Sequence, residues 1–269
     1  MEELKEKWNK LNATLKNMKR VAVAFSAGVD STLLLKAAYE ALGEDVIAIT
    51  GNFISFPNRE NQEAKLFCQA LGVKQIVIDI DQMAIKGFSN NPPERCYLCK
   101  KALFSQFLTV AKENGCSFVV EGANADDVND YRPGMKAVEE LGIQSPLRDV
   151  GLTKREIRAL SEKLGLPTWN KPSFACLATR FPYNECITPE KISMVDKAEQ
   201  LLLDCGFHQE RVRIHGNIAR IEIEQSQFSK IIEPKVIETI VQKFHELGFL
   251  YVTLDLNGYV TGSMNKTLN

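Results

Sequence analysis

Phe-Ser-Ala-Gly-Val-Asp-Ser-Thr, residues 25–32, joins an apolar run to a helical pattern. The run before it, residues 21–25, is rich in β-branched residues and predicts a buried strand. Residues 33–38 are mostly apolar and open a helix. Small residues at such a turn let backbone N–H groups close around an anion, and the helix N-terminus adds partial positive charge. The stretch therefore predicts a phosphate-binding turn, with an ordinary serine-capped strand–turn–helix junction as the alternative.

The hydroxyl residues of the loop, and the lack of a lysine in it, indicate which kind of phosphate-binding loop it is. Ser26, Ser31 and Thr32 offer additional hydrogen-bond donors. The lysine and the four-residue spacer of a Walker A loop are missing, which argues against that motif. The spacing of Ser26, Gly28, Asp30 and Ser31 resembles instead the pyrophosphate-binding loop of ATP pyrophosphatases, which transfer AMP to a substrate.

Strands and helices alternate along the first part of the chain. Further strands are predicted at 46–50, 74–80 and 117–121, with helical stretches at 55–71 and after residue 95. This alternation predicts an α/β fold: a parallel sheet with helices on both faces. Ligands of such sheets bind beyond the carboxyl ends of the strands. We therefore expect the turns at Ser26, Gly51 and Gly122, which follow three of the strands, to line one edge.

The rest of the chain predicts a second, small α+β domain. Helices are expected over 189–205 and 226–247, strands over 211–215 and 218–224, and a hairpin of 251–256 with 259–264 around Asn257-Gly258. A break is expected near Pro234. Periodic signals are sparse over 171–188, which predicts an active-site loop and connector. The expected parts are thus 1–170, the nucleotide domain with an amphipathic N-terminal helix; 171–188; and 189–269, for substrate binding or oligomerisation.

The overall composition argues against several classes of protein. A net charge of −1 over 269 residues gives no field that would attract nucleic acid. The sequence contains no apolar run near the roughly 18 residues that span a bilayer, and its N-terminus lacks a secretory apolar region. Seven cysteines, an odd number, argue for reduced thiols and a cytoplasmic protein.

Two adjacent carboxylates, Asp126 and Asp127, follow Gly122 at the predicted ligand edge. Carboxylates beside a phosphate site repel it unless they hold Mg²⁺ or bind cationic side chains. The alternative is that they are helix N-cap and first-turn residues. The phosphate loop favours the magnesium interpretation.

Cysteines form one close pair and one isolated candidate. Cys96 and Cys99 make a C-x-x-C pair, and Cys176 lies in the predicted connector. Together they could supply three thiolates to a [4Fe-4S] cluster with one open iron. A redox pair at Cys96 and Cys99 is the alternative. The remaining cysteines are expected to be buried and structural: Cys68, Cys116, Cys186 and Cys205.

Two arginines alternate on a predicted strand, so both guanidinium groups face the same side. Arg211 and Arg213 suit a carboxylate or a phosphate, which they can grip bidentately. Cross-strand pairing with Glu222 or Glu224 is the alternative.

Over nearly its whole length the chain resembles the LarE family of ATP-dependent sacrificial sulfur transferases. The matching segments are the loop at 26–31, residues 122–127, 130–134, 169–171, 180–183 and 211–213, Glu199, residues 219–222 and the stretch 251–265. The resemblance implies adenylation of a carboxylate of pyridinium-3,5-biscarboxylic acid mononucleotide, release of pyrophosphate, and replacement of the adenylate by sulfur. This reaction belongs to the synthesis of the nickel-pincer nucleotide of lactate racemase. The resemblance also implies a homo-oligomer.

Individual roles follow from the same resemblance. It implies catalytic roles for Cys176, Asp30 and Arg180; nucleotide contacts from Ser26, Ala27, Gly28, Asp30, Ser31, Thr32, Asn52, Gly122, Asp126 and Asp127; and substrate contacts from Arg132, Glu199, Arg211 and Arg213. In one branch the sulfur comes from the enzyme's own cysteine, which becomes dehydroalanine. In another, three cysteines hold a [4Fe-4S] cluster. The trio of Cys96, Cys99 and Cys176 matches the second branch, because a purely sacrificial enzyme needs Cys176 alone.

One residue of the phosphate loop, Ala27, departs from the family's sequence. The family usually has glycine at the position of Ala27. If that backbone needs a positive φ, alanine costs about 1 kcal/mol; otherwise its methyl group approaches the pyrophosphate.

A tRNA thiolation enzyme of the same superfamily is one alternative function, although no basic module supports it. A nucleotide- or metal-binding module without turnover is the other.

Overall fold

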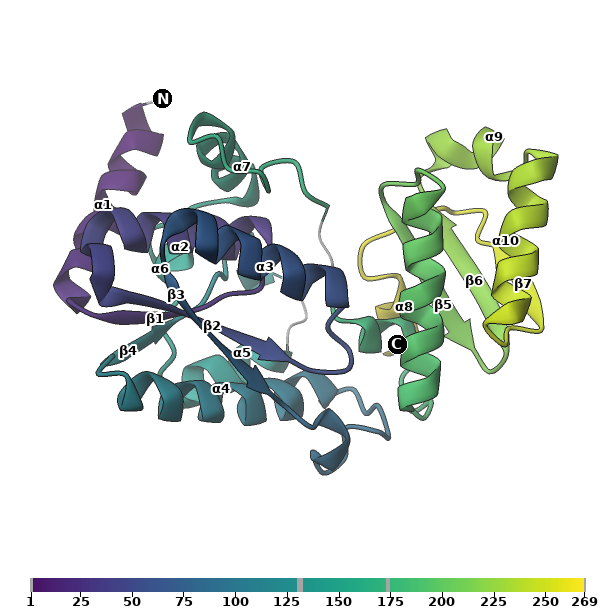
Figure 1. Cartoon of the computed structure of the whole chain (residues 1–269), viewed down its shortest axis with the longest axis horizontal. Coiled ribbons are helices and arrows are strands. Elements are labelled where there is room, and N and C mark those ends of the chain that lie inside the picture. The colour runs from purple at the N-terminus through teal and green to yellow at the C-terminus, as the bar shows by residue number, and fades with distance from the viewer. Residues whose placement is uncertain (1, 130–132, 173–174, 269) are drawn as a thin grey trace. The chain divides into compact units, whose positions relative to one another are not determined.

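The computed structural model describes residues 2–129, 133–172 and 175–268. The chain divides into two compact units (Figure 1). The first comprises Met1–Ile85 with Glu94–Phe174, and the second comprises Lys86–Pro93 with Ala175–Asn269. The short segment Lys86–Pro93, which lies within the predicted nucleotide domain, thus belongs to the second unit. Its Asn91 donates side-chain hydrogen bonds to the carbonyls of Phe181 and Pro182.

A parallel sheet forms the centre of the first unit. Its strands are β1 (Val21–Ala24), β2 (Val46–Asn52), β3 (Lys74–Asp79) and β4 (Phe118–Val120), in the order β3-β2-β1-β4. Helices α1 (Glu2–Met18), α2 (Val29–Leu42) and α3 (Asn58–Leu71) lie on one face, and α4 (Arg95–Glu113) and α5 (Pro133–Glu140) lie on the other (Figure 1). This arrangement confirms the predicted α/β fold.

The apolar runs in the sequence explain why these strands are central. Val21, Ala22 and Val23 of β1 are fully buried, because helices cover both faces of the sheet. The amphipathic helix α1 packs on its own unit, with Leu11 and Leu15 fully buried. It is also tied to α7 by an ion pair of 2.8 Å between Lys7 and Glu156.

Two short helices complete the first unit: α6 (Pro146–Asp149) and α7 (Lys154–Lys163). A capping box opens α7, in which the Thr153 hydroxyl accepts from the backbone of Glu156 and the Glu156 carboxylate accepts from the backbone of Thr153. The box fixes the first turn of α7, and with it the backbone of Lys154.

The second unit is a small α+β domain, as predicted. It contains α8 (Pro189–Asp204), β5 (Glu210–His215), β6 (Ile218–Ile223), α9 (Phe228–Ile231), α10 (Pro234–Glu246) and β7 (Tyr251–Leu254). Strand β6 pairs antiparallel with β5 and parallel with β7. The helical break falls between Ile231 and Pro234, where proline begins a new helix.

The predicted C-terminal hairpin is wrong. Residues 251–256 and 259–264 do not pair with each other; β7 pairs with β6 instead. The turn at Asn257-Gly258 exists, but it packs on the end of β6, where Tyr259 N–H donates to the Ile223 carbonyl at 2.8 Å. A Cβ at position 258 would lie 2.7 Å from that carbonyl oxygen, so close packing explains the glycine.

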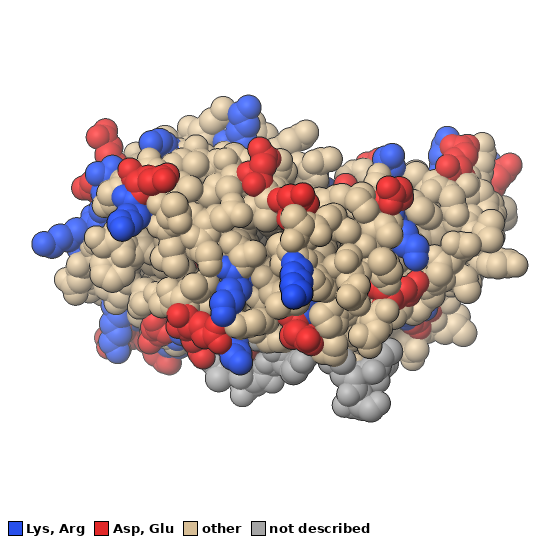
Figure 2. All heavy atoms as spheres, turned by 90° about the horizontal axis from the view of Figure 1, so that it is seen from below, with Lys and Arg blue, Asp and Glu red and all other residues tan. Residues whose placement is uncertain are grey.

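Charges of both signs are distributed over the visible face in Figure 2, with uncharged surface between them. Lys and Arg side chains form no continuous stripe on that face. In the described part of the chain, no helix combines the length and the apolar character needed to cross a membrane.

Candidate active site

The phosphate loop lies between the end of β1 and the start of α2. Inside it, the Ser26 and Ser31 hydroxyl oxygens are 3.2 Å apart, and Ser31 Oγ donates to the Gly28 carbonyl at 3.2 Å. Helix α2 begins at Val29, so its unpaired N–H groups lie at this turn. Thr32 is fully buried within α2. The turn therefore offers the donors that an anion needs, mainly from the backbone and from Ser26.

Ala27 adopts the left-handed conformation, with φ of 54°. Its side chain is buried. The first of the two possibilities for this residue thus applies: the loop needs a positive φ, and alanine carries strain of about 1 kcal/mol that glycine would not.

Gly122 brings a second turn against the same helix terminus. It follows β4, and a Cβ at this position would lie 3.0 Å from the Ser31 backbone nitrogen and 3.3 Å from the carbonyl carbon of Asp30. Because those neighbours are backbone atoms, they cannot rotate away. Any larger residue at this position would have to push the loop after β4 away from the phosphate loop by a few tenths of an ångström.

Gly122→Ala is therefore expected to destabilise the protein by about 1–3 kcal/mol, the usual cost of overpacking. Gly28→Ala is the matched control, since its Cβ would meet only ordinary contacts, 3.5 Å from the Ser26 hydroxyl. Urea unfolding without nucleotide measures both free energies. Equal stabilities for the two variants would contradict the close approach at Gly122.

An ion pair between Lys154 and Asp30 connects α7 to the phosphate loop. The Asn124 amide donates to the other Asp30 oxygen at 3.3 Å. The backbone N–H of Lys154 also donates to Asp126 at 2.8 Å. Lys154 is absent from the predicted site residues, because 124 residues separate it from Asp30 and no motif marks it.

The paired carboxylates also have local structural roles. Asp127 accepts from the backbone N–H of Asn124 at 3.0 Å, within the turn Ala125–Asn129. Asp126 lies within the same turn and is exposed. On β2, Asn52 donates to Asp79 at 2.5 Å and accepts from Asn61 at 2.9 Å. Asn52 therefore ends its strand in a polar network.

Cys96 and Cys99 lie in the first two turns of α4, each half-buried. Arg95 donates to the Cys96 sulfur at 3.3 Å, and Gln82 donates to the Cys99 sulfur at 3.1 Å. Hydrogen-bond donors stabilise the deprotonated form of a cysteine, the thiolate, and a cysteine binds a metal in this form. The pair suits a redox role or ligation equally well.

The other cysteines divide by burial. Cys68 and Cys116 are buried as predicted, and burial raises the pKa of Cys68 to about 12, which makes it inert. Cys205 is half-buried. Cys186 is exposed, contrary to the prediction. All seven cysteines lie in the described ranges, and none forms a disulfide.

Cys176 belongs to the second unit and directly precedes a 3₁₀ turn, Leu177–Arg180. Its backbone carbonyl accepts from the Thr179 hydroxyl at 2.8 Å. Arg180 in turn donates to that hydroxyl at 2.7 Å and to the Ala175 carbonyl at 3.1 Å. The turn around Cys176 is thus organised by a buried arginine.

Arg180 forms a buried ion pair with Glu199, with nitrogen–oxygen distances of 2.6 and 3.0 Å. Both side chains are at most 1% exposed. Burial alone would lower the pKa of Arg180 and raise that of Glu199. The attraction within the pair outweighs burial, so the Glu199 pKa lies below and the Arg180 pKa above its ordinary value. Glu199 also accepts from the Val212 backbone, which locks α8 to β5.

Arg211 and Arg213 extend to the same face of β5, and both are buried. Arg213 forms an ion pair with Glu222 on the neighbouring strand at 2.9 Å. This is the cross-strand pairing that was the alternative to anion binding. The Arg211 guanidinium stacks 5.0 Å from the Tyr259 ring centre. Burial, together with the nearby Arg180 charge, lowers the pKa of Arg211.

Two parts of the predicted site are not seen in the structure: the substrate contact Arg132 and the group of three metal-binding cysteines. Arg132 lies outside the described residues. Within the described ranges 2–129, 133–172 and 175–268, no three His, Cys, Asp or Glu side chains form a group that could hold a metal ion. Cys96 and Cys99 belong to the first unit, whereas Cys176 belongs to the second.

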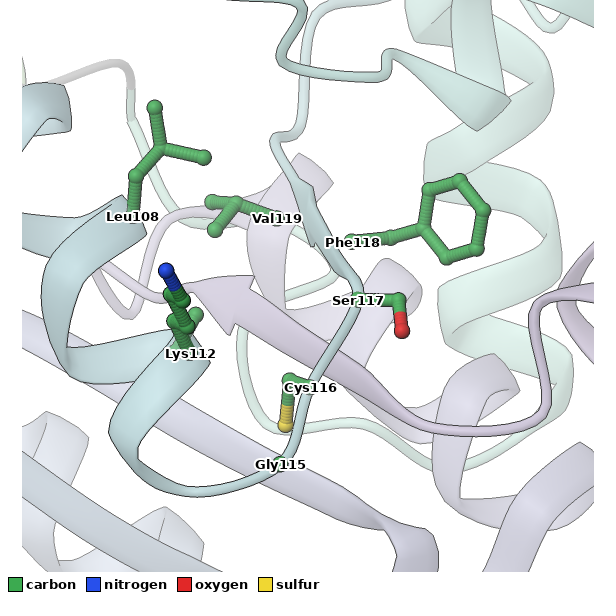
Figure 3. Close-up of a pocket in the computed structure, with 8 residues that line it drawn as sticks. Leu108, Lys112, Gly115, Cys116, Ser117, Phe118 and Val119 are labelled. Carbon is green, nitrogen blue, oxygen red and sulfur yellow. The ribbon is translucent and has the colours of Figure 1, made fainter.

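A cavity of about 410 Å³ lies at the start of β4 (Figure 3). Leu108 and Lys112 of α4, with Cys116 and Val119, are among the residues that line it. The nucleotide loops follow the carboxyl ends of the strands, whereas this cavity adjoins the amino end of β4. It is therefore separate from the predicted ligand edge.

A parallel sheet with a serine-rich loop at the N-terminus of α2, and no Walker lysine, defines a nucleotide-binding protein of the ATP pyrophosphatase type. The family model described as NAD synthase matches residues 3–95. An uncharacterized protein of Synechocystis sp. is 40% identical over 98% of this chain and 99% of its own length. Pyridinium-3,5-bisthiocarboxylic acid mononucleotide synthase of Lactiplantibacillus plantarum is 39% identical, over 96% of this chain and 93% of its own. Argininosuccinate synthase of Haloarcula marismortui is 29% identical, over 55% and 37%. The chain belongs to the LarE family of ATP-dependent sulfur transferases.

Proposed function

We propose that this enzyme uses ATP to convert a carboxylate of pyridinium-3,5-biscarboxylic acid mononucleotide into a thiocarboxylate, for the nickel-pincer nucleotide of lactate racemase. The likeness to a synthase of the bisthiocarboxylic product, over 96% of the chain, carries the proposal. The loop at Ser26, which lacks a Walker lysine, supports adenylation rather than transfer of the terminal phosphate.

The first step is the formation of an acyl adenylate. A substrate carboxylate oxygen attacks the α-phosphorus of ATP, the bond to the β-phosphate breaks, and pyrophosphate leaves. We assign the phosphates to the loop from Ser26 to Thr32 and to the turn after Gly122. Asp126 and Asp127 would hold Mg²⁺ together with phosphate oxygens of the nucleotide, since oxygen atoms are the ligands it prefers, and the metal would neutralise the pyrophosphate charge.

The second step replaces AMP with sulfur. Sulfur attacks the acyl carbon, a carbon–sulfur bond forms, and the carbon–oxygen bond to AMP breaks. If Cys176 supplies the sulfur, its thiolate forms a thioester; loss of the Cα proton then breaks the Cβ–sulfur bond and leaves dehydroalanine. We assign to Arg180 the role of holding the turn that presents Cys176.

A [4Fe-4S] cluster is the other sulfur source that we propose. Cys96, Cys99 and Cys176 would hold it, and the hydrogen bonds from Arg95 and Gln82 to the sulfur atoms of the first two fit thiolate ligands. Such a cluster supplies an open iron on which a sulfur atom can be carried.

We place the negatively charged pyridinium mononucleotide near the buried arginines of the second unit. Arg211 and Arg213 are the proposed contacts, and Arg132 is a further candidate from the sequence. Glu199 is fully buried against Arg180, so its proposed part is to position that arginine rather than to touch the substrate. We further propose that the protein is cytoplasmic and that it forms a homo-oligomer. Mass photometry would test the oligomeric state.

The experiment is an anaerobic reaction with ATP, Mg²⁺ and the pyridinium biscarboxylic mononucleotide. We expect pyrophosphate and AMP to form in step with thiocarboxylate, and to need the mononucleotide. Intact mass then separates the sulfur sources: loss of one H₂S from the protein indicates a sacrificed Cys176, whereas unchanged protein, bound iron and several turnovers indicate the cluster. Thiolation of tRNA, or ATP binding without pyrophosphate release, would contradict the proposal.

A further inference from the structure

Lys171 lies beneath the phosphate loop and contacts it directly. Its ammonium donates to the Ala27 carbonyl at 3.2 Å, to Glu60 at 2.7 Å and to Glu63 at 2.5 Å. An ammonium group has three N–H donors, and these three acceptors match them. The Lys171 side chain is only 12% exposed.

The backbone of Lys171 is held in place from another element. Arg158 of α7 donates to the Lys171 carbonyl at 2.8 Å and to the Trp169 carbonyl at 2.7 Å. The Lys171 N–H donates to the Thr168 carbonyl at 3.0 Å. Helix α3 supplies the two glutamates one turn apart. The ammonium is therefore fixed by α3 and α7, independently of the loop that it contacts.

The bond to Ala27 falls on the one residue of the loop with a strained backbone. Ala27 has a φ of 54°, which an alanine adopts only at a cost. A hydrogen bond to its carbonyl fixes the direction in which the peptide group between Ala27 and Gly28 points. That peptide carries the Gly28 N–H, which faces away from the carbonyl because the peptide is planar and trans.

We infer that Lys171 is a positioning residue: it holds Ala27 in the left-handed conformation, so that the backbone N–H groups of the loop stay directed at the phosphates. This inference rests on the proposed function, because it takes the nucleotide as the ligand of the loop. Alanine at position 27 makes the loop depend on Lys171. A glycine there would adopt the same φ without help.

A double-mutant cycle tests this dependence. The Kd for a non-hydrolysable ATP analogue is measured for the wild type, Lys171→Met, Ala27→Gly and the double variant. Lys171→Met is expected to weaken binding about five- to tenfold, the population change that corresponds to the strain of one left-handed alanine. In the Ala27→Gly background the same change is expected to weaken binding less than about twofold. Lys65→Met, which removes an exposed charge from α3, should leave Kd unchanged.

The outcomes separate positioning from direct contact. An equal loss in both backgrounds would show that Lys171 touches the nucleotide itself, and would overturn the inference. Weaker binding by Ala27→Gly alone would overturn it as well. If Lys171→Met does not fold because Glu60 loses its cation, Lys171→Met with Glu60→Gln replaces it in the cycle.

The same four proteins are also unfolded in urea without nucleotide, which measures the effect of each change on stability in the absence of binding. Lys171→Met is expected to lower the urea midpoint less in the Ala27→Gly background than in the wild type. A wild-type chain that fails to bind ATP would refute the proposed function, whereas identical midpoint shifts in the two backgrounds would refute the inference.

Discussion

Cys176→Ser is expected to abolish thiocarboxylate formation, by more than about a thousandfold, while the first equivalent of pyrophosphate per active site is still released at near the wild-type rate. Serine keeps the size of the side chain, but its hydroxyl carries no sulfur and is a poor ligand for iron. The phosphate loop lies in the other unit, so the adenylation step keeps its own residues. Pyrophosphate release and thiocarboxylate are quantified in the same anaerobic reaction.

Cys186→Ser is the matched control, because Cys186 is an exposed thiol of the same unit. It should retain full thiocarboxylate formation. A Cys176→Ser variant with wild-type yield would show that this thiol neither donates nor carries the sulfur. Loss of pyrophosphate release together with sulfur transfer would place Cys176 in the adenylation step instead.

Glu199→Gln is expected to destabilise the protein by about 3–5 kcal/mol, because it leaves Arg180 buried without its counter-charge. The pair is at most 1% exposed and makes two close contacts. Urea unfolding measures the difference. Glu238→Gln, on the exposed side of α10, should stay within about 0.5 kcal/mol of the wild type. A loss below about 1 kcal/mol at Glu199 would mean that the pair contributes little to folding.

The same pair predicts how stability depends on pH. The folded protein holds the pKa of Glu199 below its ordinary 4.5, because Arg180 outweighs the effect of burial. The stabilisation is therefore complete above pH 4.5 and declines as the pH falls below that value toward the folded-state pKa. Glutamine does not titrate, so the gap in stability between wild type and Glu199→Gln should narrow as the pH falls below 4.5. A constant gap would contradict the lowered pKa.

The first unit could be predicted from local patterns, because each of its strands lies between helices that cover the two faces of the sheet. The apolar run before Ser26 and the small residues after it specify a strand, a turn and a helix in one short stretch. The C-terminal strand could not be predicted in the same way. Asn257-Gly258 signals a tight turn correctly, but the partner of β7 is β6, and that choice depends on packing between segments far apart in the sequence.

The candidate site shows the same division between local and distant information. The phosphate loop after β1 and the glycine turn after β4 follow from residue types that the sequence displays, whereas the positive φ of Ala27 and the close approach of Gly122 are seen only in the structure. The two lysines that contact the loop could not be predicted from the sequence. Lys154 is 124 residues from its partner Asp30, and Lys171 is 144 residues from its partner Ala27. A lysine in a helix or loop carries no local sign of its ion partner. The roles of the individual side chains in catalysis stay predictions.

The segment Lys86–Pro93 has a consequence for the order in which the chain folds. Ser89 and Asn91 accept backbone hydrogen bonds from Ile187 and Asn184, and Phe88 is buried in the second unit. During synthesis Asn91 leaves the ribosome 90 positions before Phe181, whose carbonyl accepts from its side chain. Closing a loop of that length costs entropy before any contact repays it. Completion of the second unit must therefore wait for residues 184–187, even though one of its parts is made in the middle of the first.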